Sequence, residues 1–470
     1  MYTIVNILPE LFLSFSIMFL LMLGVFIKNS YKLINFLTIL SLVFSIFLVF
    51  SQSYDSIKIF NESYIIDQFS IFMKILVLLF SLFVLVISKE YVKSNNIDKI
   101  EYPIIILSST LGMVLMISSY DLIIFYLALE LQSICLYILA SFKREDLKST
   151  EAGLKYFILS ALASGLLLYG CSLIYGFTGS TNFDVISNSL SDSNTGAIFG
   201  IVFIIVALAF KISAVPFHMW TPDVYEGSPT SITSFFALIP KIAGMAVFIR
   251  FMYVPFVNAI EQWQTIIVFL SIASMTLGAV AAIGQNNIKR LIAYSSIGHM
   301  GYALAGLAAG TDNGIQSTII YLTIYLVMNL GIFGCIFMMR RENIFFENIN
   351  DLSGLSKNHP LLALSFLLIL FSLAGIPPLA GFFAKFYIFM AVIEANMYML
   401  AIIGLVTTVV SAFYYLRVIK IIYFDRPKKP FDISYDWGLK LSLALSSILI
   451  LVYFVQPSIL TDIISSIKIY

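Results

Sequence analysis

Five ionisable residues lie deep inside long apolar segments, where charged groups need a reason to exist. Glu130 is nine residues into the segment that begins at Asp121, a depth of about 13 Å at 1.5 Å per residue. Lys241 lies about 18 Å past Pro229, and His299 lies about 15 Å into its own segment. All three groups are therefore expected near the middle of a hydrocarbon core roughly 30 Å thick.

Lys211 and Lys385 each lie close to prolines that interrupt a helix. Pro216 follows Lys211 by one turn, and a Pro377-Pro378 pair flanked by glycines precedes Lys385. A proline removes a backbone donor and breaks or kinks the helix, and irregular backbone at membrane depth implies a polar, hydrated cavity. The sequence therefore predicts two broken helices, each next to a buried lysine.

We call Glu130, Lys211, Lys241, His299 and Lys385 the buried row. Burial weakens proton binding by a lysine, and a nearby carboxylate strengthens it. A carboxylate that moves toward or away from such a lysine can load or unload a proton near neutral pH. One isolated buried lysine would equally suggest a structural ion pair, but five titratable groups at one level predict a proton relay.

Other ionisable residues allow simpler explanations. Lys155 lies about one turn from a basic loop, so snorkelling to the interface and a secondary relay role are equally supported. His218 and Asp223 lie beside the first break, where capping or loop packing is the default and proton entry the sharper hypothesis. Lys74 and Arg250 lie near helix ends, where we expect them to snorkel.

The elements that position these groups are membrane helices. Of 470 residues, 60% are apolar and 11% charged, and the mean hydropathy is +0.97. An ordinary soluble domain, roughly half apolar and a quarter charged, is excluded. At roughly 34 residues per helix and loop the length allows about 14 spans. We expect them near 7–27, 33–51, 69–88, 103–118, 121–141, 152–177, 196–216, 229–253, 262–283, 289–309, 315–339, 359–395, 398–416 and 438–458.

The positions of the basic residues predict the orientation of these spans. Connections after odd-numbered spans carry 18 Lys and Arg, whereas the opposite side carries only Lys58 and Lys468. By the positive-inside rule both termini face away from the cytoplasm. The first apolar segment lacks a basic leader and a cleavage site, so we expect it to be retained.

Several classes of function are disfavoured by what the sequence lacks. With 27 Lys and Arg against 26 Asp and Glu, there is no broad basic face for nucleic acid. The three cysteines, Cys135, Cys171 and Cys335, form no CxxC pair, so neither an iron–sulfur nor a zinc site is expected. No nucleotide-binding glycine motif appears in a strand-to-helix context.

The two broken helices are the seventh and twelfth spans, and an odd offset places them in opposite orientation. This pattern predicts two inverted five-helix repeats in an all-α, polytopic fold, with Ala214-Val215-Pro216 matching Gly375-Ile376-Pro377. We expect four parts: an N-terminal three-helix segment, two repeats and a last span. Their ranges are 1–102, 103–253, 254–424 and 425–470.

Four motifs carry a family resemblance along essentially the whole chain. They are Phe125–Ser133, Phe210–Pro229, Asn287–Tyr302 and Ser372–Lys385. With them the chain resembles the antiporter-like membrane subunits of respiratory complex I (NADH-quinone oxidoreductase). The loop Pro222–Pro229 is similar to that of one branch, and differs from the Pro-Asp-Ala-His-type loop of sister subunits and cation/proton antiporters.

The resemblance implies roles for the buried row. It implies that Glu130 partners Lys211, that Lys241 and His299 form the central axis, and that Lys385 faces the outward half-channel. It also implies no cofactor in this chain, with FMN, iron–sulfur clusters and quinone in other subunits. The implied partners are neighbouring antiporter-like and small membrane subunits, the lipid bilayer, protons and water.

The favoured function is thus one proton-translocating module of a redox-driven complex in a bacterial inner membrane, with a mitochondrial inner membrane as the alternative location. A second hypothesis is a subunit of a cation/proton antiporter on the same fold. A third is a structural subunit whose buried pairs only fix helix packing.

Overall fold

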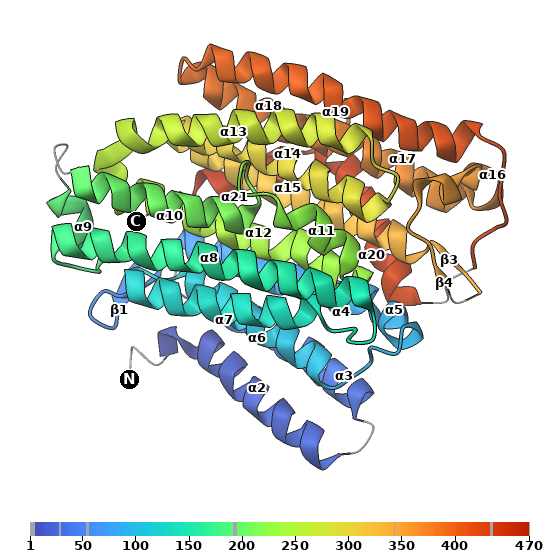
Figure 1. Cartoon of the computed structure of the whole chain (residues 1–470), viewed down its shortest axis with the longest axis horizontal. Helices are drawn as coiled ribbons and strands as arrows, with labels where there is room; N and C mark the ends of the chain where they lie inside the picture. Colours follow the sequence, from blue (N-terminus) through green and yellow to red (C-terminus); the bar gives the residue numbers. More distant parts are fainter. Residues whose placement is uncertain are drawn as a thin grey trace.

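The structure is a computed structural model that describes residues 5–27, 30–52, 56–190, 195–342, 344–432 and 436–469. It is a bundle of long helices with two short hairpins, which confirms the prediction of an all-α membrane fold (Figure 1). Within the described ranges, eleven helices are long and apolar enough to cross a membrane. They are α2 (Leu8–Phe26), α3 (Tyr31–Phe50), α4 (Gln68–Ile87), α7 (Leu122–Ala140), α8 (Leu147–Thr178), α10 (Thr195–Ile212), α12 (Thr230–Tyr253), α13 (Ile260–Ile283, with a preceding 3-10 turn), α15 (Asp312–Phe337), α19 (Tyr398–Phe424) and α20 (Trp437–Val455).

The remaining three expected spans are also helical. They are α6 (Glu101–Ile117), α14 (Ile288–Ala308) and the pair formed by α17 (Pro360–Ala374) and α18 (Ala380–Glu394). The twelfth span is thus two half-helices, as the length and the Pro-Pro pair predict. Two spans differ most from expectation. Helix α8 begins about five residues earlier, where the Asp146 side chain caps its first turn. Helix α19 continues to Phe424, beyond the expected end at 416, because the helix extends past the apolar segment that hydropathy identifies.

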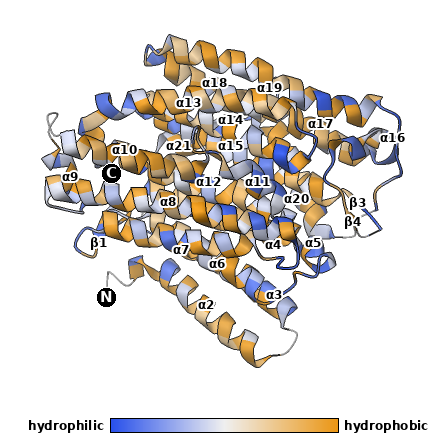
Figure 2. Cartoon of the chain, in the orientation of Figure 1, coloured by the Kyte–Doolittle hydropathy of each residue, from blue (hydrophilic) through white to orange (hydrophobic). Residues whose placement is uncertain are grey.

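Different short elements lie at the two ends of the bundle (Figure 1). One end carries the hairpin of β1 (Ile57–Ile59) and β2 (Tyr64–Ile66) and helix α9 (Phe183–Ser189). The other carries α5 (Lys89–Ser94), α16 (Leu355–Asn358) and the hairpin of β3 (Arg340–Arg341) and β4 (Ile344–Phe345). Figure 2 shows hydrophilic residues gathered at this second end, which we call the basic end, while apolar residues dominate the helices between.

Helix α12 lies at the centre of the bundle. Every residue of its most apolar stretch is buried, which is why it is apolar around its whole circumference. Lys241 is in the middle of this helix, directly after Pro240. A helix enclosed by protein on all sides can hold a charged residue without exposing it to lipid.

The two breaks share one backbone pattern. Helix α10 ends at Ile212, and Ser213 takes a left-handed φ of 65°. Helix α17 ends at Ala374, and Gly375 takes a φ of 85°. In each break the next residue closes the helix, with Ala214 N donating to Ala209 O (2.8 Å) and Ile376 N to Phe371 O (3.0 Å). These bonds match Ala214 with Ile376, one residue away from the register that we expected.

The expectation that Lys74 and Arg250 snorkel to the interface is wrong. The Lys74 ammonium lies 2.7 Å from Glu10 of α2, and both side chains are fully buried. The Arg250 guanidinium makes two bonds of 2.9 Å to the carboxylate of Asp67, which caps α4. Each cation stays inside because a distant segment supplies a carboxylate at its level.

Candidate functional site

Lys211 is held by serines of two neighbouring helices. It lies in the last turn of α10, and its ammonium donates to Ser133 Oγ of α7 (2.7 Å) and Ser160 Oγ of α8 (2.8 Å). Tyr137 also donates to Ser160 Oγ (2.6 Å). The lysine is buried, so these neutral hydroxyl groups replace water around its charge.

Glu130 lies near Lys211 without touching it. The carboxylate is half-buried on α7, one turn before Ser133, and is within Coulombic range of Lys211. Its Oε1 atom has no hydrogen-bond partner among the described residues. The direct partnership that the family resemblance implies is therefore not formed in this state. Ser133 takes the place next to the ammonium instead.

Lys241 lies next to a missing backbone hydrogen bond of α12. Its ammonium donates to Ser296 Oγ of α14 (2.6 Å) and lies 5.3 Å from the ring centre of Tyr225. Pro240 cannot donate to the carbonyl of Phe236, four residues earlier. The Tyr225 hydroxyl of α11 (Trp220–Gly227) donates to that carbonyl instead, at 3.1 Å.

The backbone of α12 also brings Lys241 close to Lys211. Gly244 follows Lys241 by one turn, and a Cβ atom there would lie 3.9 Å from Lys211 Cβ and 3.1 Å from Ile212 Cγ2. The missing side chain lets α10 and α12 approach each other at this level. The two lysines thus lie on facing surfaces of adjacent helices.

His299 continues the row on α14, one turn after Ser296. Its Nδ1 atom lies 2.6 Å from the Tyr321 hydroxyl and its Nε2 atom 3.1 Å from the Tyr415 hydroxyl. The imidazole is within Coulombic range of both Lys241 and Lys385. Both ring nitrogens therefore have a hydroxyl partner, which is the arrangement that proton transfer through an imidazole requires.

Lys385 closes the second break. It lies in α18, and its ammonium donates to the carbonyls of Leu373 (3.1 Å) and Ala374 (3.0 Å) at the end of α17. A helix C-terminus attracts a cation, because its last carbonyls have no partner within the helix. The ammonium also lies 5.0 Å from the ring centre of Tyr302, whose ring is 6.3 Å from those of His299 and Tyr321.

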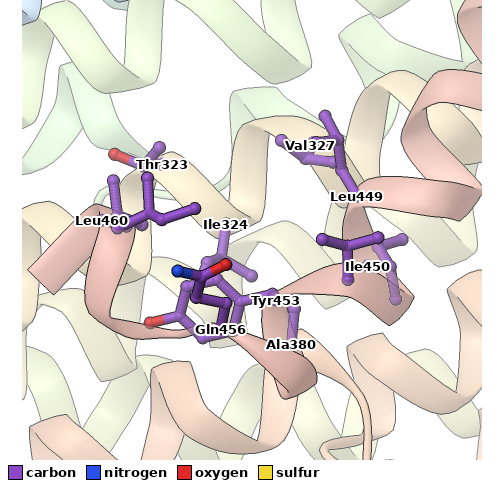
Figure 3. Close-up of a pocket in the computed structure, with 11 residues that line it drawn as sticks. Thr323, Ile324, Val327, Ala380, Leu449, Ile450, Tyr453, Gln456 and Leu460 are labelled. Atoms are coloured by element: carbon purple, nitrogen blue, oxygen red, sulfur yellow. The ribbon is translucent and has the colours of Figure 1, made fainter.

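A cavity of about 240 Å³ lies beside this second break (Figure 3). It is bounded by Ala380, the first residue of α18, and by residues of α15, α20 and α21 (Ser458–Ser465). Most of its lining is apolar, but Thr323, Tyr453 and Gln456 supply polar groups.

Lys155 and Asp223 belong to a surface cluster outside the buried row. The Lys155 ammonium lies 2.8 Å from Glu151 and 3.0 Å from Asp223, and its side chain is 42% exposed. Arg290 lies 2.9 Å from Asp223. This geometry favours the snorkelling interpretation of Lys155. His218 lies in the first break, between α10 and α11. It is half-buried, and burial lowers its pKa below the usual value.

We expect the stabilisation from Asp223 to depend on pH. Partial burial acts to raise the pKa of Asp223, but hydrogen bonds from Lys155 and Arg290 outweigh it and hold the pKa below its usual 3.8. The stabilisation is therefore present at neutral pH and is lost as the pH falls through the lowered pKa. In thermal denaturation of the assembled complex, Asp223→Asn should lower the Tm at pH 7, and the difference should shrink at acidic pH. A difference that grows as the pH falls would contradict this assignment.

We expect Gly381→Ala to disturb the packing of α18 against α17 at the second break. An added Cβ would lie 1.8 Å from Ser372 O, so α17 and α18 would have to separate. Overpacking of this kind costs about 1–3 kcal/mol or more. Less of the subunit should therefore be found in the assembled complex, as quantified by immunoblot. Gly165→Ala is the matched control, because that helical glycine has open space around it. Equal assembly of both variants would count against the proposed geometry.

Some of these residues were not singled out from the sequence. Pro240 beside Lys241 was a visible signal, since it frees a carbonyl next to a buried charge. Ser133, Ser160 and Ser296 carried no such signal, because serines are common in helices of this kind. Among the described residues, no group of three or more His, Cys, Asp or Glu could hold a metal ion.

Comparisons with known proteins identify the family. Residues 119–411 match the family described as NADH:quinone oxidoreductase/Mrp antiporter, TM. The chain is 63% identical over 464 residues to NADH-quinone oxidoreductase subunit N of Pelagibacter ubique, covering 98% of each chain. It is 52% identical over 456 residues to subunit N of Parvibaculum lavamentivorans, covering 96% of this chain and 94% of the relative.

Two solved structures share the architecture. A chain in the structure of respiratory complex I from Thermus thermophilus with bound aureothin has a TM-score of 0.83 and 30% identity, covering 97% of this chain and 98% of that one. A chain of the Mrp complex from Dietzia sp. has a TM-score of 0.85 at 21% identity, covering 98% and 96%, and supports the fold alone. The chain belongs to the NADH:quinone oxidoreductase/Mrp antiporter family of membrane subunits, and it is most similar in sequence to bacterial N subunits among the relatives named here.

Proposed function

We propose that the chain translocates protons along the buried row, as a membrane subunit of NADH-quinone oxidoreductase. One observation carries the assignment of the row. Lys211, Lys241 and Lys385 donate to serine hydroxyls or backbone carbonyls, and within the described residues none has a carboxylate within 4.0 Å. Lys74 and Arg250, by contrast, are fixed in buried ion pairs.

This difference matters for proton movement. A carboxylate in contact stabilises the charged lysine and so holds its proton, whereas neutral partners allow the lysine to exist in either state. Movement of Glu130 into contact with Lys211 would strengthen proton binding there, and its withdrawal would release the proton. Lys241 and His299 pass the change along α12 and α14 toward Lys385.

The family membership supports a role without redox chemistry in this chain. The chain is a subunit of a translocase. Its relatives carry the name NADH-quinone oxidoreductase, which describes electron transfer from NADH to quinone. We propose that FMN, iron–sulfur clusters and quinone are held by other subunits, and that neighbouring antiporter-like and small membrane subunits are its partners. We also propose a bacterial inner membrane, with the basic end in the cytoplasm and both termini periplasmic.

The two breaks support an arrangement in repeats. We propose that residues 103–253 and 254–424 are inverted repeats, preceded by the three-helix segment 1–102 and followed by 425–470. The matched closing bonds of Ala214 and Ile376 support this division, as each break lies in the fourth helix of its unit. Each repeat would then line one half of the proton route.

The experiment uses the assembled complex in sealed vesicles, with NADH as the electron donor. Proton uptake per electron is followed with a pH-sensitive dye. We expect Glu130→Gln to lower this ratio, because the amide cannot modulate Lys211 by its charge. Unchanged coupling would overturn the assignment.

The same vesicles separate the other two functions. A cation/proton antiporter would move protons in response to a Na⁺ or K⁺ gradient in the absence of NADH. A purely structural subunit would lose assembly when the row is altered, while the surviving complexes would pump normally.

A further inference from the structure

A groove lined by several lysines lies at the basic end, away from the buried row. It has a volume of about 780 Å³ and lies between the start of α3, the end of α4 with α5, and the start of α20. Three exposed lysines line it: Lys32, Lys89 and Lys93. None of them forms an ion pair within the described residues.

The two carboxylates of the groove are engaged by other groups. Glu90 lies 3.2 Å from Arg340, and Asp436 accepts from the backbone N–H of Gly438 at the start of α20 (2.9 Å). With three lysines against two carboxylates, the groove carries a net positive charge. Such a cluster at the level of a membrane surface attracts anionic headgroups.

The lining changes character with distance from the lysines. Tyr31 and Trp437 are aromatic residues of the kind that lie at headgroup level, and Trp437 is 81% exposed. Further along α3 and back along α4, Ile39 and Leu85 offer an apolar surface. Asn35 lies between these levels on α3; it is 6% exposed, and its side-chain oxygen has no hydrogen-bond partner within the described residues.

We propose that this groove is a binding site for one anionic phospholipid of the leaflet at the basic end. The three lysines bind the phosphate, Tyr31 and Trp437 flank the glycerol region, and the apolar part of the groove takes an acyl chain. A protein segment would need carboxylates opposite the lysines and an apolar face below them, whereas a single phospholipid supplies both in that order.

The test uses the assembled complex in vesicles that contain a photoactivatable phosphatidylglycerol or the matching phosphatidylcholine, with a diazirine on the acyl chain. Cross-linked peptides are mapped by mass spectrometry. Each basic residue near a membrane surface favours anionic lipid by about fivefold. We therefore expect phosphatidylglycerol to label α3, α4 and α20 at this groove at least tenfold more than phosphatidylcholine does.

The triple variant Lys32→Gln, Lys89→Gln and Lys93→Gln should reduce this labelling to the phosphatidylcholine level. The matched control replaces Lys357, Lys420 and Lys429, which are also exposed at the basic end, and should leave it unchanged. If the triple variant does not assemble, Lys93→Gln alone should lower the labelling about fivefold. Equal labelling by both lipids, labelling unaffected by the lysines, or cross-links from another subunit in this groove would overturn the proposal.

Discussion

Lys241→Arg is expected to abolish proton pumping while it keeps the positive charge in place. An arginine can still donate to Ser296, but it stays protonated under all working conditions and cannot release a proton. Proton uptake per electron should fall by the share that this subunit contributes to the complex, because its relay no longer releases a proton. Lys241→Ala should have a similar effect. The measurement is NADH-driven acidification of vesicles, normalised to electron transfer.

A second buried lysine provides the control for this experiment. Lys74 is as deeply buried as Lys241, but its ammonium is in contact with Glu10. Lys74→Arg preserves that ion pair, so the complexes that assemble should pump normally. If Lys241→Arg also pumps normally, the lysine supplies only charge, and the relay role is wrong. If both arginine variants lose pumping, burial rather than proton transfer is the cause.

Arg250→Met is expected to produce the largest loss of stability. It leaves the Asp67 carboxylate buried without its cation, which costs about 3–5 kcal/mol. Less of the subunit should therefore be retained in the membrane and in the complex, as measured by quantitative immunoblot after detergent extraction. The two side chains lie 183 residues apart in sequence, so the pair ties α4 to the end of α12.

The double variant Asp67→Asn/Arg250→Met separates this cause from a packing defect. Asparagine can still accept from Ser70 N and cap α4, and methionine fills much of the arginine volume. Removal of both charges should restore most of the lost assembly, because no unpaired charge remains. A double variant that assembles no better than Arg250→Met would show that the volume of the arginine, and not its charge, is what matters.

Local signals predicted much of this fold from the sequence. Hydropathy located the spans, and prolines located both breaks, because each depends on residues within one or two turns. The partners of Lys74 and Arg250 could not be predicted in this way, since Glu10 is 64 residues from Lys74 and Asp67 is farther still from Arg250. A cation near a helix end suggests the interface unless the fold brings a carboxylate to it.

The buried row shows the same limit. Its members could be found one by one, since a charged residue in an apolar segment is visible in the sequence. Their contacts could not, because Lys211 selects serines from α7 and α8 and leaves Glu130 out of contact. The choice between a carboxylate and a hydroxyl depends on differences of a few ångströms in helix packing.

Helix α11 has a mechanical consequence for the central lysine. It carries Asp223, which is held by two cations at the surface, and two residues later Tyr225, which holds the Phe236 carbonyl beside Lys241. Because Pro240 cannot donate a backbone hydrogen bond, one such bond of α12 is missing. The helix can therefore bend there without breaking a backbone hydrogen bond. A displacement of α11 would therefore move Tyr225 relative to the Phe236 carbonyl, at the point where the backbone hydrogen bonding of α12 is interrupted next to Lys241.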